Sequence, residues 1–534
     1  MAIKRYVAAL CAALALVLPT LDAHAEKVLR VASTMADIPL TTGQSSQGGE
    51  GTRFIGITLY DQLIRWDLSR SDVLAKLVPG LALSWSVDEA THKVWTLKLR
   101  PGVKFHDGSD FNADAVVWTF DKLLNRKAPQ FDQSQAAQIS QYIANFDTYR
   151  AIDPMTVEIT TKVPDATFPY MLAGINIGSS PARYKELGGD WSKIAFKPSG
   201  TGPWMLDKLV PRERAEMVRN PNYWDPARVP KSDRMILFAM PDPNTRVAAL
   251  LSGQVDWVEA PPPDTIPRLK SAGMQIITNV YPHVWPYIPN LGPASVFHDI
   301  RVRKAANLAI DRVGLSEFLG GTAMPAQGAI DPKHPWFGKP NFKIEYNPEE
   351  AKRLMKEAGY GPDKPAKIRI AVSTSGSGQM QPLPMNEFIQ ENLKEVGFDV
   401  ELVVMEWEEL RSHRRASADE PANKGIDALN NSVAYWDPYS GLIGVADSQL
   451  RPPRGYNWGG YNDPEADRLA RAAAVEFDPA KQDKLLGQLH SRIVDQAMWI
   501  WVVHDLNPRA LSPRVKGFVQ AQSWFQDLTP VYVE

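Results

Sequence analysis

Apolar and polar residues alternate along two short runs within the stretch from Pro79 to Leu124. Such alternation predicts two strands that each bury one face of a sheet, with a turn at Asp88 to Lys93 between them. Asn112 then precedes apolar residues at helical spacing, which predicts a helix that Asn112 caps. The apolar positions are Leu83, Trp85 and Val87 in the first run, Trp95, Leu97 and Leu99 in the second, and Val116, Phe120, Leu123 and Leu124 in the helix.

Helix caps and short apolar runs alternate along the C-terminal half of the chain. Asn347, Asp463 and Asp478 each precede a proline and then an amphipathic pattern, which predicts three capped helices. Glu406 to Glu409 are likewise read as the start of a helix. Apolar runs that predict strands lie at 366–372, 400–405 and 498–503. Strands alternating with helices favour an α/β fold.

One longer helical pattern runs from Asp299 to Gly321. It carries Arg301, Arg303 and Arg312 among apolar residues. Because charged side chains on a helix are most often solvated, we expect these three arginines to form an exposed face rather than an anion site.

The first 25 residues have the pattern of a secretory signal peptide. Lys4 and Arg5 precede an apolar run too short to span a bilayer, and Ala23-His24-Ala25 forms a small-x-small cleavage site. The only cysteine, Cys11, lies inside this segment and follows Leu10, unlike the cysteine of a lipoprotein signal. The sequence thus predicts cleavage before Glu26, no lipid anchor, and a periplasmic location.

The remaining 509 residues contain no cysteine, so neither disulfides nor a thiolate metal site is expected. This length suggests two to four domains. The 57 basic and 60 acidic side chains give a net charge near −3 before histidine. That balance argues against nucleic acid as a partner, because binding phosphates requires a basic surface.

The usual signatures of catalysis and of metal binding are missing from the sequence. The chain has no G-x-S-x-G, H-E-x-x-H, C-x-x-C or Walker motif, and its eight histidines after residue 25 are scattered without ligand spacing. Gly200-Thr201-Gly202 runs into Pro203 and is interpreted as a tight turn rather than a phosphate loop. We therefore expect a binding protein without cofactor or metal, and keep only His283 and His504 as histidines of interest.

Several motifs resemble family 5 of the extracellular solute-binding proteins of ABC importers, the dipeptide, oligopeptide and nickel binders. The stretch 79–124 matches the signature block of that family along nearly its whole length. Residues 200–206, 220–225 and 299–312 are similar to three further steps of the family pattern. The resemblance implies a periplasmic binding protein of the class II, cluster C type, with two hinged lobes, three domains and an inner-membrane ABC permease as partner. We expect a monomer.

The resemblance also implies domains built from separate pieces of chain. Domain I is predicted to combine residues 26–67, 191–282 and 503–534. Domain II is predicted to span 68–190 and domain III 283–502. The solute is expected in the cleft between the lobes.

Family resemblance supplies most of the candidate binding residues. Trp407 occupies the place of a ligand-stacking tryptophan, with a core tryptophan as the alternative. Peptide binders of this family hold the ligand amine with an aspartate that corresponds to Ala434 here, although Asp437 is close enough to replace it. The loop 373–384, where dipeptide binders carry an arginine for the carboxylate, has no basic residue.

A zwitterionic peptide end would thus lack both partners, and a buried charge needs one. We therefore expect a less charged solute, such as an opine-like conjugate or an oligosaccharide. The expected ligand-binding residues are Gln44, Ser45, Ser375, Gln379 and Gln381 as polar groups, Trp407, Tyr435 and Trp436 as walls, and Asp437. Three alternatives stay open: a peptide binder with shifted anchors, a periplasmic hydrolase acting on cell-wall material, and a receptor-presenting or chaperone-like binder that uses the same fold without transport.

Overall fold

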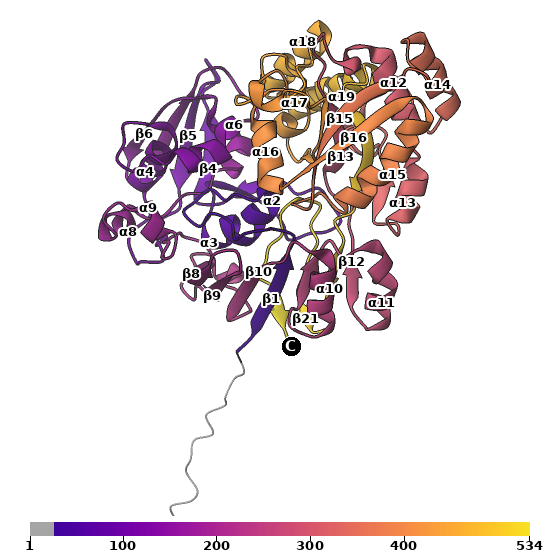
Figure 1. Ribbon diagram of the computed structural model, residues 1–534. Helices are drawn as coiled ribbons and strands as arrows, with labels where there is room; N and C mark the ends of the chain where they lie inside the picture. The colour runs from indigo at the N-terminus through magenta and orange to yellow at the C-terminus, as the bar shows by residue number, and fades with distance from the viewer. Residues whose placement is uncertain (1–25) are drawn as a thin grey trace, which may run out of the picture.

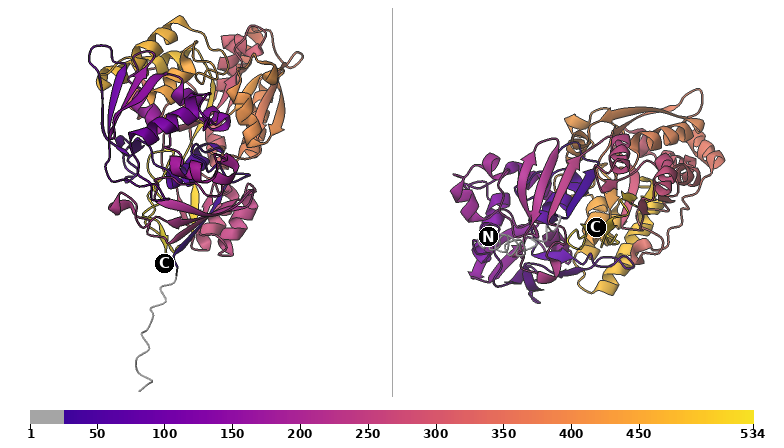
Figure 2. Two further views of the ribbon diagram at one scale, coloured as in Figure 1. Left: turned by 90° about the vertical axis from the view of Figure 1, so that its left-hand side faces the viewer. Right: turned by 90° about the horizontal axis from the view of Figure 1, so that it is seen from below.

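The computed structural model describes residues 26–534, and the predicted signal peptide lies outside them. The described chain forms two lobes (Figure 1). Lobe 1 comprises residues 26–282 and 506–534, and lobe 2 comprises residues 283–505. Seen from the side and from below, the four-stranded part of lobe 1 lies beside lobe 2, and both described chain ends, Glu26 and Glu534, belong to lobe 1 (Figure 2).

A seven-stranded sheet forms the base of lobe 1. Its central strand β1 (Val28–Ser33) pairs in parallel with β10 on one side and with β11 on the other, and buries Leu29 and Val31 completely. The strand order is β12 (Gln275–Ile277), β20 (Arg509–Leu511), β11 (Trp257–Glu259), β1, β10 (Arg234–Ala239), β9 (Arg214–Arg219) and β8 (Trp204–Val210). Strand β20 returns from the C-terminal end of the chain, so this sheet is built from segments far apart in sequence.

Short helices follow the strands of this sheet. A continuous helical stretch after β1 is made of α2 (Gly48–Gly51), the π-helical turn η1 (Thr52–Gly56) and α3 (Ile57–Leu59). Helices α10 (Pro243–Leu251) and α11 (Ile266–Ser271) belong to the same part of lobe 1. The Gly200-Thr201-Gly202 segment is irregular, with a bend at Thr201 and Gly202, and a Cβ on Gly200 would lie 1.9 Å from the Leu59 carbonyl oxygen.

The stretch 79–124 builds the core of a smaller four-stranded antiparallel sheet. Trp95, Leu97 and Leu99 are buried, and the side chain of Asn112 accepts a hydrogen bond from the Ala115 N–H, both as predicted. Leu83 is instead 44% exposed, because the pairing shifts by one residue between Ala82 and Ser84 and leaves Leu83 in a bulge. The strands are β4 (Ala82–Val87), β5 (Val94–Leu99), β7 (Thr156–Thr161) and β6 (Phe146–Asp153), in that order.

Six helices and a two-stranded ladder accompany this sheet. The helices are α4 (Ala113–Leu124), α5 (Gln133–Gln138), α6 (Ser140–Ile143), α7 (Phe168–Ala173), α8 (Pro181–Glu186) and α9 (Trp191–Ile194). The ladder pairs β2 (Ile64–Trp66) with β3 (Leu77–Pro79), and a second ladder near the C-terminus pairs β21 (Val515–Lys516) with β22 (Tyr532–Val533).

Lobe 2 is an α/β unit around a second seven-stranded sheet, which confirms the predicted fold class. Six strands run in the order β14 (Ala323–Pro325), β19 (Ile500–Asp505), β13 (His283–Pro289), β17 (Ala428–Asn430), β15 (Ala366–Ser373) and β16 (Phe398–Met405), and β18 (Val433–Ala434) pairs with β13. The surrounding helices are α12 (Ile300–Ala309), α13 (Arg312–Phe318), α14 (Pro348–Glu357), α15 (Pro382–Glu395), α16 (Trp407–Arg415), α17 (Gly444–Ala446), α18 (Pro464–Ala474) and α19 (Pro479–Asp495).

The predicted caps of lobe 2 are confirmed. The side chains of Asn347, Asp463 and Asp478 accept hydrogen bonds from the third residue of their helices, and Glu406 caps α16. Strand β19 runs to Asp505, beyond the predicted boundary of domain III at residue 502. The three-domain division remains a prediction.

The predicted long helix at 299–321 and its exposed arginine face are wrong in part. The chain leaves helical geometry at Ile310, and Asp311 caps a second helix, so two helices replace one. Arg301 is exposed, but Arg303 and Arg312 are buried. The Arg312 side chain donates to the carbonyls of Asn307 and Ile310 at the end of α12 and to the carbonyl of Trp501 on β19, so it joins the helix end to the sheet.

Candidate functional site

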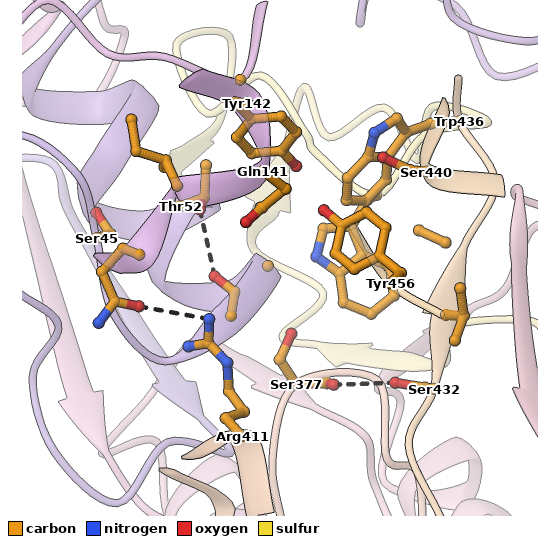
Figure 3. Close-up of a pocket in the computed structure, with 18 of the residues that line it drawn as sticks. Ser45, Thr52, Gln141, Tyr142, Ser377, Arg411, Ser432, Trp436, Ser440 and Tyr456 are labelled. Atoms are coloured by element: carbon orange, nitrogen blue, oxygen red, sulfur yellow. Dashed lines mark hydrogen bonds between the residues drawn. The ribbon is translucent and has the colours of Figure 1, made fainter. Parts of the chain in front are cut away.

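A cavity of about 200 Å³ lies between the two lobes. Lobe 1 contributes Gln44, Ser45, Thr52, Gln138, Gln141 and Tyr142, together with Trp524 and Phe525 from the C-terminal segment. Lobe 2 contributes His283, Ser377, Trp407, Arg411, Arg414, Trp436 and Tyr456, among others. Figure 3 shows Gln141 and Tyr142 of lobe 1 across the cavity from Trp436, Ser440 and Tyr456 of lobe 2. Aromatic walls with polar groups between them are typical of small-molecule sites.

Direct hydrogen bonds join the lobes around this cavity. The backbone N–H of Gln47 donates to Glu408 Oε1 at 3.0 Å. Arg411, which is labelled in Figure 3, donates from Nη2 to Gln138 Oε1 at 3.4 Å. On another side Gln381 Nε2 donates to the Ala260 carbonyl at 3.3 Å. The lobes are therefore in contact on more than one side of the cavity, as in a closed two-lobed binding protein.

The cations of the cavity wall come from one helix, α16. Arg411 is paired with Glu408 at 2.8 Å. Arg414 takes part in none of the ion pairs found within residues 26–534, and its Nε is buried without a hydrogen-bond partner. Burial lowers the pKa of Arg414 to about 10, so its guanidinium stays protonated at neutral pH, 5.2 Å from the centre of the Tyr456 ring. The wall thus presents positive charge to whatever occupies the cavity.

None of the residues within 26–534 that line the cavity is a carboxylate, so nothing on its surface balances the charge of Arg414. Asp437 lies behind the wall, where its Oδ1 accepts a hydrogen bond from the Ser440 N–H and its Oδ2 is buried without a partner. Burial raises the pKa of Asp437 to about 6. Ala434 lines the cavity at the position where the family pattern has its aspartate.

His283 is the histidine of the cavity wall. Its ring stacks on Tyr281, with 5.1 Å between ring centres, and lies 4.4 Å from the indole of Trp524. Both ring nitrogens are buried without hydrogen-bond partners. Burial holds the pKa of His283 well below its usual range, so the ring is neutral. His504 lies behind it, with Nδ1 2.9 Å from the His283 carbonyl oxygen.

Four of the nine residues expected from sequence line the cavity: Gln44, Ser45, Trp407 and Trp436. Gln379 lies one layer back, where its Nε2 donates to Ser432 Oγ. Ser375 and Gln381 are not among the lining residues. Tyr435 borders a different cleft, and its hydroxyl accepts a hydrogen bond from the Asp331 N–H. The roles of these nine residues in binding stay predictions.

Sequence reasoning missed the two arginines because it sought a cation only in the loop 373–384. Their spacing of three residues on a helix that begins at Trp407 was the available signal, since Trp407, Arg411 and Arg414 recur on one helical face. Among residues 26–534, no three histidine, cysteine or acidic side chains are arranged to hold a metal ion. In the same residues no helix has the length and apolar character required to cross a bilayer.

Comparison with known proteins places the chain among bacterial binding proteins. The family model described as "Bacterial extracellular solute-binding proteins, family 5 Middle" matches residues 76–449. Heme-binding protein A of Haemophilus influenzae is 28% identical over 88% of this chain and 86% of its own length. Glutathione-binding protein GsiB of Escherichia coli K12 is 28% identical over 83% of each chain.

The solved structures confirm the predicted periplasmic binding protein fold. DppA of Helicobacter pylori, in complex with the peptide STSA, superposes with a TM-score of 0.81 at 20% identity, covering 95% of this chain and 99% of its own. The dipeptide-binding protein of Pseudoalteromonas sp. SM9913 bound to Met-Leu also gives 0.81 at 20% identity, covering 95% of this chain and all of its own.

Proposed function

Because the chain belongs to family 5 of the bacterial extracellular solute-binding proteins, we propose that it captures a small carboxylate-bearing solute in the periplasm and delivers it to an ABC importer permease. An opine-like conjugate of a sugar and an amino acid fits this description. Ligand-driven closure would bring the two lobes together and create the surface that the permease recognises.

Arg414 carries the proposal of an anionic ligand. Arg414 is half-buried and forms none of the ion pairs found within residues 26–534, so a carboxylate that reached it would gain an interaction that the protein itself leaves unmade. A neutral oligosaccharide would leave this cation uncompensated. The expectation of a weakly charged solute is therefore revised to one anionic group together with several neutral hydrogen-bonding groups.

The remaining wall supports a polar, compact solute. Buried side-chain atoms without hydrogen-bond partners gather here, and each can bind a hydroxyl, amide or amine of the solute. They include Ser45 Oγ, Asn431 Oδ1, Ser440 Oγ and the indole N–H groups of Trp407 and Trp524. The cavity of about 200 Å³ is smaller than the roughly 300–1,000 Å³ of drug-sized ligand sites, which favours a compact solute over a macrocycle such as haem.

A peptide bound through shifted anchors is the second candidate, and Asp437 is the observation that favours it. Its unpartnered Oδ2 could hold an amine if the wall around Ser440 moved. The hydrolase alternative has less support, because within residues 26–534 no hydrogen bond joins a serine of the wall to His283, and the wall has no pair of carboxylates. Relatives in the family are named as binding proteins.

Thermal shift measurements test the proposal, because a ligand that binds the folded state raises its stability by mass action. The probes are mannopinic acid, reduced glutathione, the dipeptide Met-Leu and the neutral sugar maltotriose. We expect a carboxylate-bearing conjugate to raise the melting temperature by a few degrees at saturating concentration, and maltotriose to have no effect. Met-Leu acting alone would favour the peptide alternative.

Replacing Arg414 tests whether this cation binds the carboxylate of the solute or whether the solute is held by the rest of the cavity. Arg414→Met should abolish the shift given by the carboxylate probe, whereas Arg268→Met, on the exposed surface of α11, should preserve it. Stabilisation by maltotriose that survives in Arg414→Met would overturn the proposed ligand class.

A further inference from the structure

The loop that leads into the cavity wall is held by an unusual set of side chains. Residues 41–45 are buried although they form neither helix nor strand. Buried backbone carbonyls need hydrogen-bond donors, and here four consecutive carbonyls each accept one from a side chain. Tyr60 Oη donates to Thr41 O, Lys122 Nζ to Thr42 O, Asn176 Nδ2 to Gly43 O and Gln135 Nε2 to Gln44 O.

Three of these four donors belong to predicted domain II, residues 68–190. Gln135 also accepts the hydrogen bond of the Gln44 N–H, so it binds both backbone groups of that residue. Asn176 holds the Gln44 side chain through its own backbone, accepting from Nε2 at 2.8 Å and donating to Oε1 at 3.2 Å. The side chain of Gln44 is thus used within the protein, and Ser45 is the next residue along the loop.

Glycine is required at position 43 of this loop. Its φ of +138° lies in a region that other residues rarely adopt. A Cβ at this position would also lie 3.0 Å from Gln135 Oε1 and 3.4 Å from Lys122 Nζ. The loop backbone and the domain II side chains are therefore closely fitted to each other.

Lys122 is the charged member of the set. Its ammonium group is buried and lies 3.7 Å from the centre of the Trp191 ring, and it forms none of the ion pairs found within residues 26–534. Asp132, the N-cap of α5, attracts it from a distance, and the Tyr60 hydroxyl is the other ionisable group bound to this loop. The Thr42 carbonyl and the Trp191 ring thus provide its direct interactions.

We propose that domain II positions the solute-binding loop through Lys122, Asn176 and Gln135, with Lys122 as a positioning residue that fixes Ser45 in the cavity wall. The proposal rests on the proposed function, because Ser45 is taken to meet the solute in that cavity. Domain II would then act as part of the binding machinery rather than as a separate appendage.

A single introduced cysteine tests this without any solute. A chain expressed from Glu26 has no thiol, so Ser45→Cys makes one reporter whose reaction with a maleimide measures opening of the loop. Lys122→Met should accelerate labelling roughly tenfold or more, because it removes a charge-assisted hydrogen bond. Lys127→Met, on an exposed residue of the same domain, is the matched control and should leave the rate unchanged.

Circular dichroism establishes that each variant is folded, and Gln135→Met is a second variant with the same expected acceleration. Equal labelling rates in the reporter alone and in folded Lys122→Met or Gln135→Met would overturn the proposal. Since no solute is present, a failed solute screen does not affect this result, and a failed labelling test does not affect the proposed function.

The pH dependence of the labelling rate shows whether the positive charge of Lys122 positions the loop or whether only the volume of its side chain matters. Burial lowers the pKa of Lys122 to about 7, so the ammonium group loses its proton within an accessible range. Labelling rates, normalised at each pH to the urea-denatured chain, should rise about fivefold from pH 6 to pH 8.5 with Lys122 present. They should stay level in Lys122→Met. The same rise in both proteins would assign it to another group and overturn the role of Lys122.

Discussion

The backbone N–H of Glu50 in lobe 1 donates a hydrogen bond of 3.0 Å to Ser377 Oγ in lobe 2. Ser377 also lines the cavity, so one side chain contacts both the opposite lobe and the space for the solute. Glu50 is itself fixed, because its carboxylate accepts hydrogen bonds from the backbone and side chain of Thr34. The bond therefore joins a rigid part of lobe 1 to the wall contributed by lobe 2.

Replacing Ser377 by alanine should weaken the closed state. A hydrogen bond contributes about 0.5–1.5 kcal/mol net, so solute affinity should fall roughly two- to tenfold in isothermal titration calorimetry. Small-angle scattering of the solute-free protein should show a larger radius of gyration. Ser412→Ala, on the exposed side of α16, is the control, and equal affinities for the two variants would contradict the role of this bond.

A second contact between the lobes lies away from the cavity. Phe477, in the link between α18 and α19, stacks on His92 of the four-stranded part of lobe 1, with 4.5 Å between ring centres. Nearby, the Ala166 N–H donates to the Ala474 carbonyl at 2.7 Å. His92, Ala166 and Phe477 lie in connections between elements and Ala474 ends α18, so both contacts would separate when the lobes open.

Phe477→Ala should therefore reduce solute affinity without touching the solute. Loss of the aromatic pair and of its buried area is expected to cost the closed state about 1–2 kcal/mol, which is roughly a five- to thirtyfold change in affinity. Titration calorimetry measures the change. Val475→Ala, at a neighbouring position that is 48% exposed, should have no effect. A variant that keeps full affinity would show that this contact does not participate in closure.

Arg312 should be far more important for stability than Arg301, although both lie in the same predicted helical segment. Arg312→Met removes the side-chain donor of three carbonyls, although Ile310 O keeps the backbone N–H of residue 312, and should lower the free energy of unfolding by about 3 kcal/mol or more. Arg301 pairs with Asp299 at the surface, so Arg301→Met should cost less than about 1 kcal/mol. Urea denaturation followed by tryptophan fluorescence compares the two; similar losses would contradict the structural assignment.

Asp437 should make stability depend on pH. Its pKa is raised from 3.8 to about 6 by burial, so the folded state binds more protons than the unfolded state between those values. The contribution of Asp437 to the free energy of unfolding is therefore fully present below pH 3.8 and is lost as the pH rises to 6. The contribution lost is about 3 kcal/mol. Asp437→Asn keeps an acceptor for the Ser440 N–H, so its melting temperature relative to the natural protein should be higher at pH 7.5 than at pH 4. A difference in melting temperature between the two proteins that stays constant from pH 4 to pH 7.5 would contradict the raised pKa of Asp437.

Helix caps and the buried face of a strand could be predicted from sequence, because each depends on residues within one short segment. Asn112, Asn347, Asp463 and Asp478 cap their helices because the cap and the N–H that it binds are three residues apart. The alternation of Trp95, Leu97 and Leu99 likewise depends on one strand. The fold class followed from such elements and from the family motifs.

Features set by distant segments could not be predicted in this way. Leu83 is exposed because its partner strand shifts register, and Arg312 is buried because its carbonyl partners on β19 are almost 200 residues away. Arg411 and Arg414 line the cavity because packing of the two lobes decides which face of α16 meets it.

Both described ends of the chain lie on lobe 1, and residues 26–534 contain no cysteine. A protein attached to a surface through its C-terminus would be held by lobe 1 alone, with lobe 2 free to swing. One cysteine placed on lobe 2 could then carry a single dye. The same architecture that lets the lobes enclose a solute would make the molecule a reagentless optical sensor for that solute.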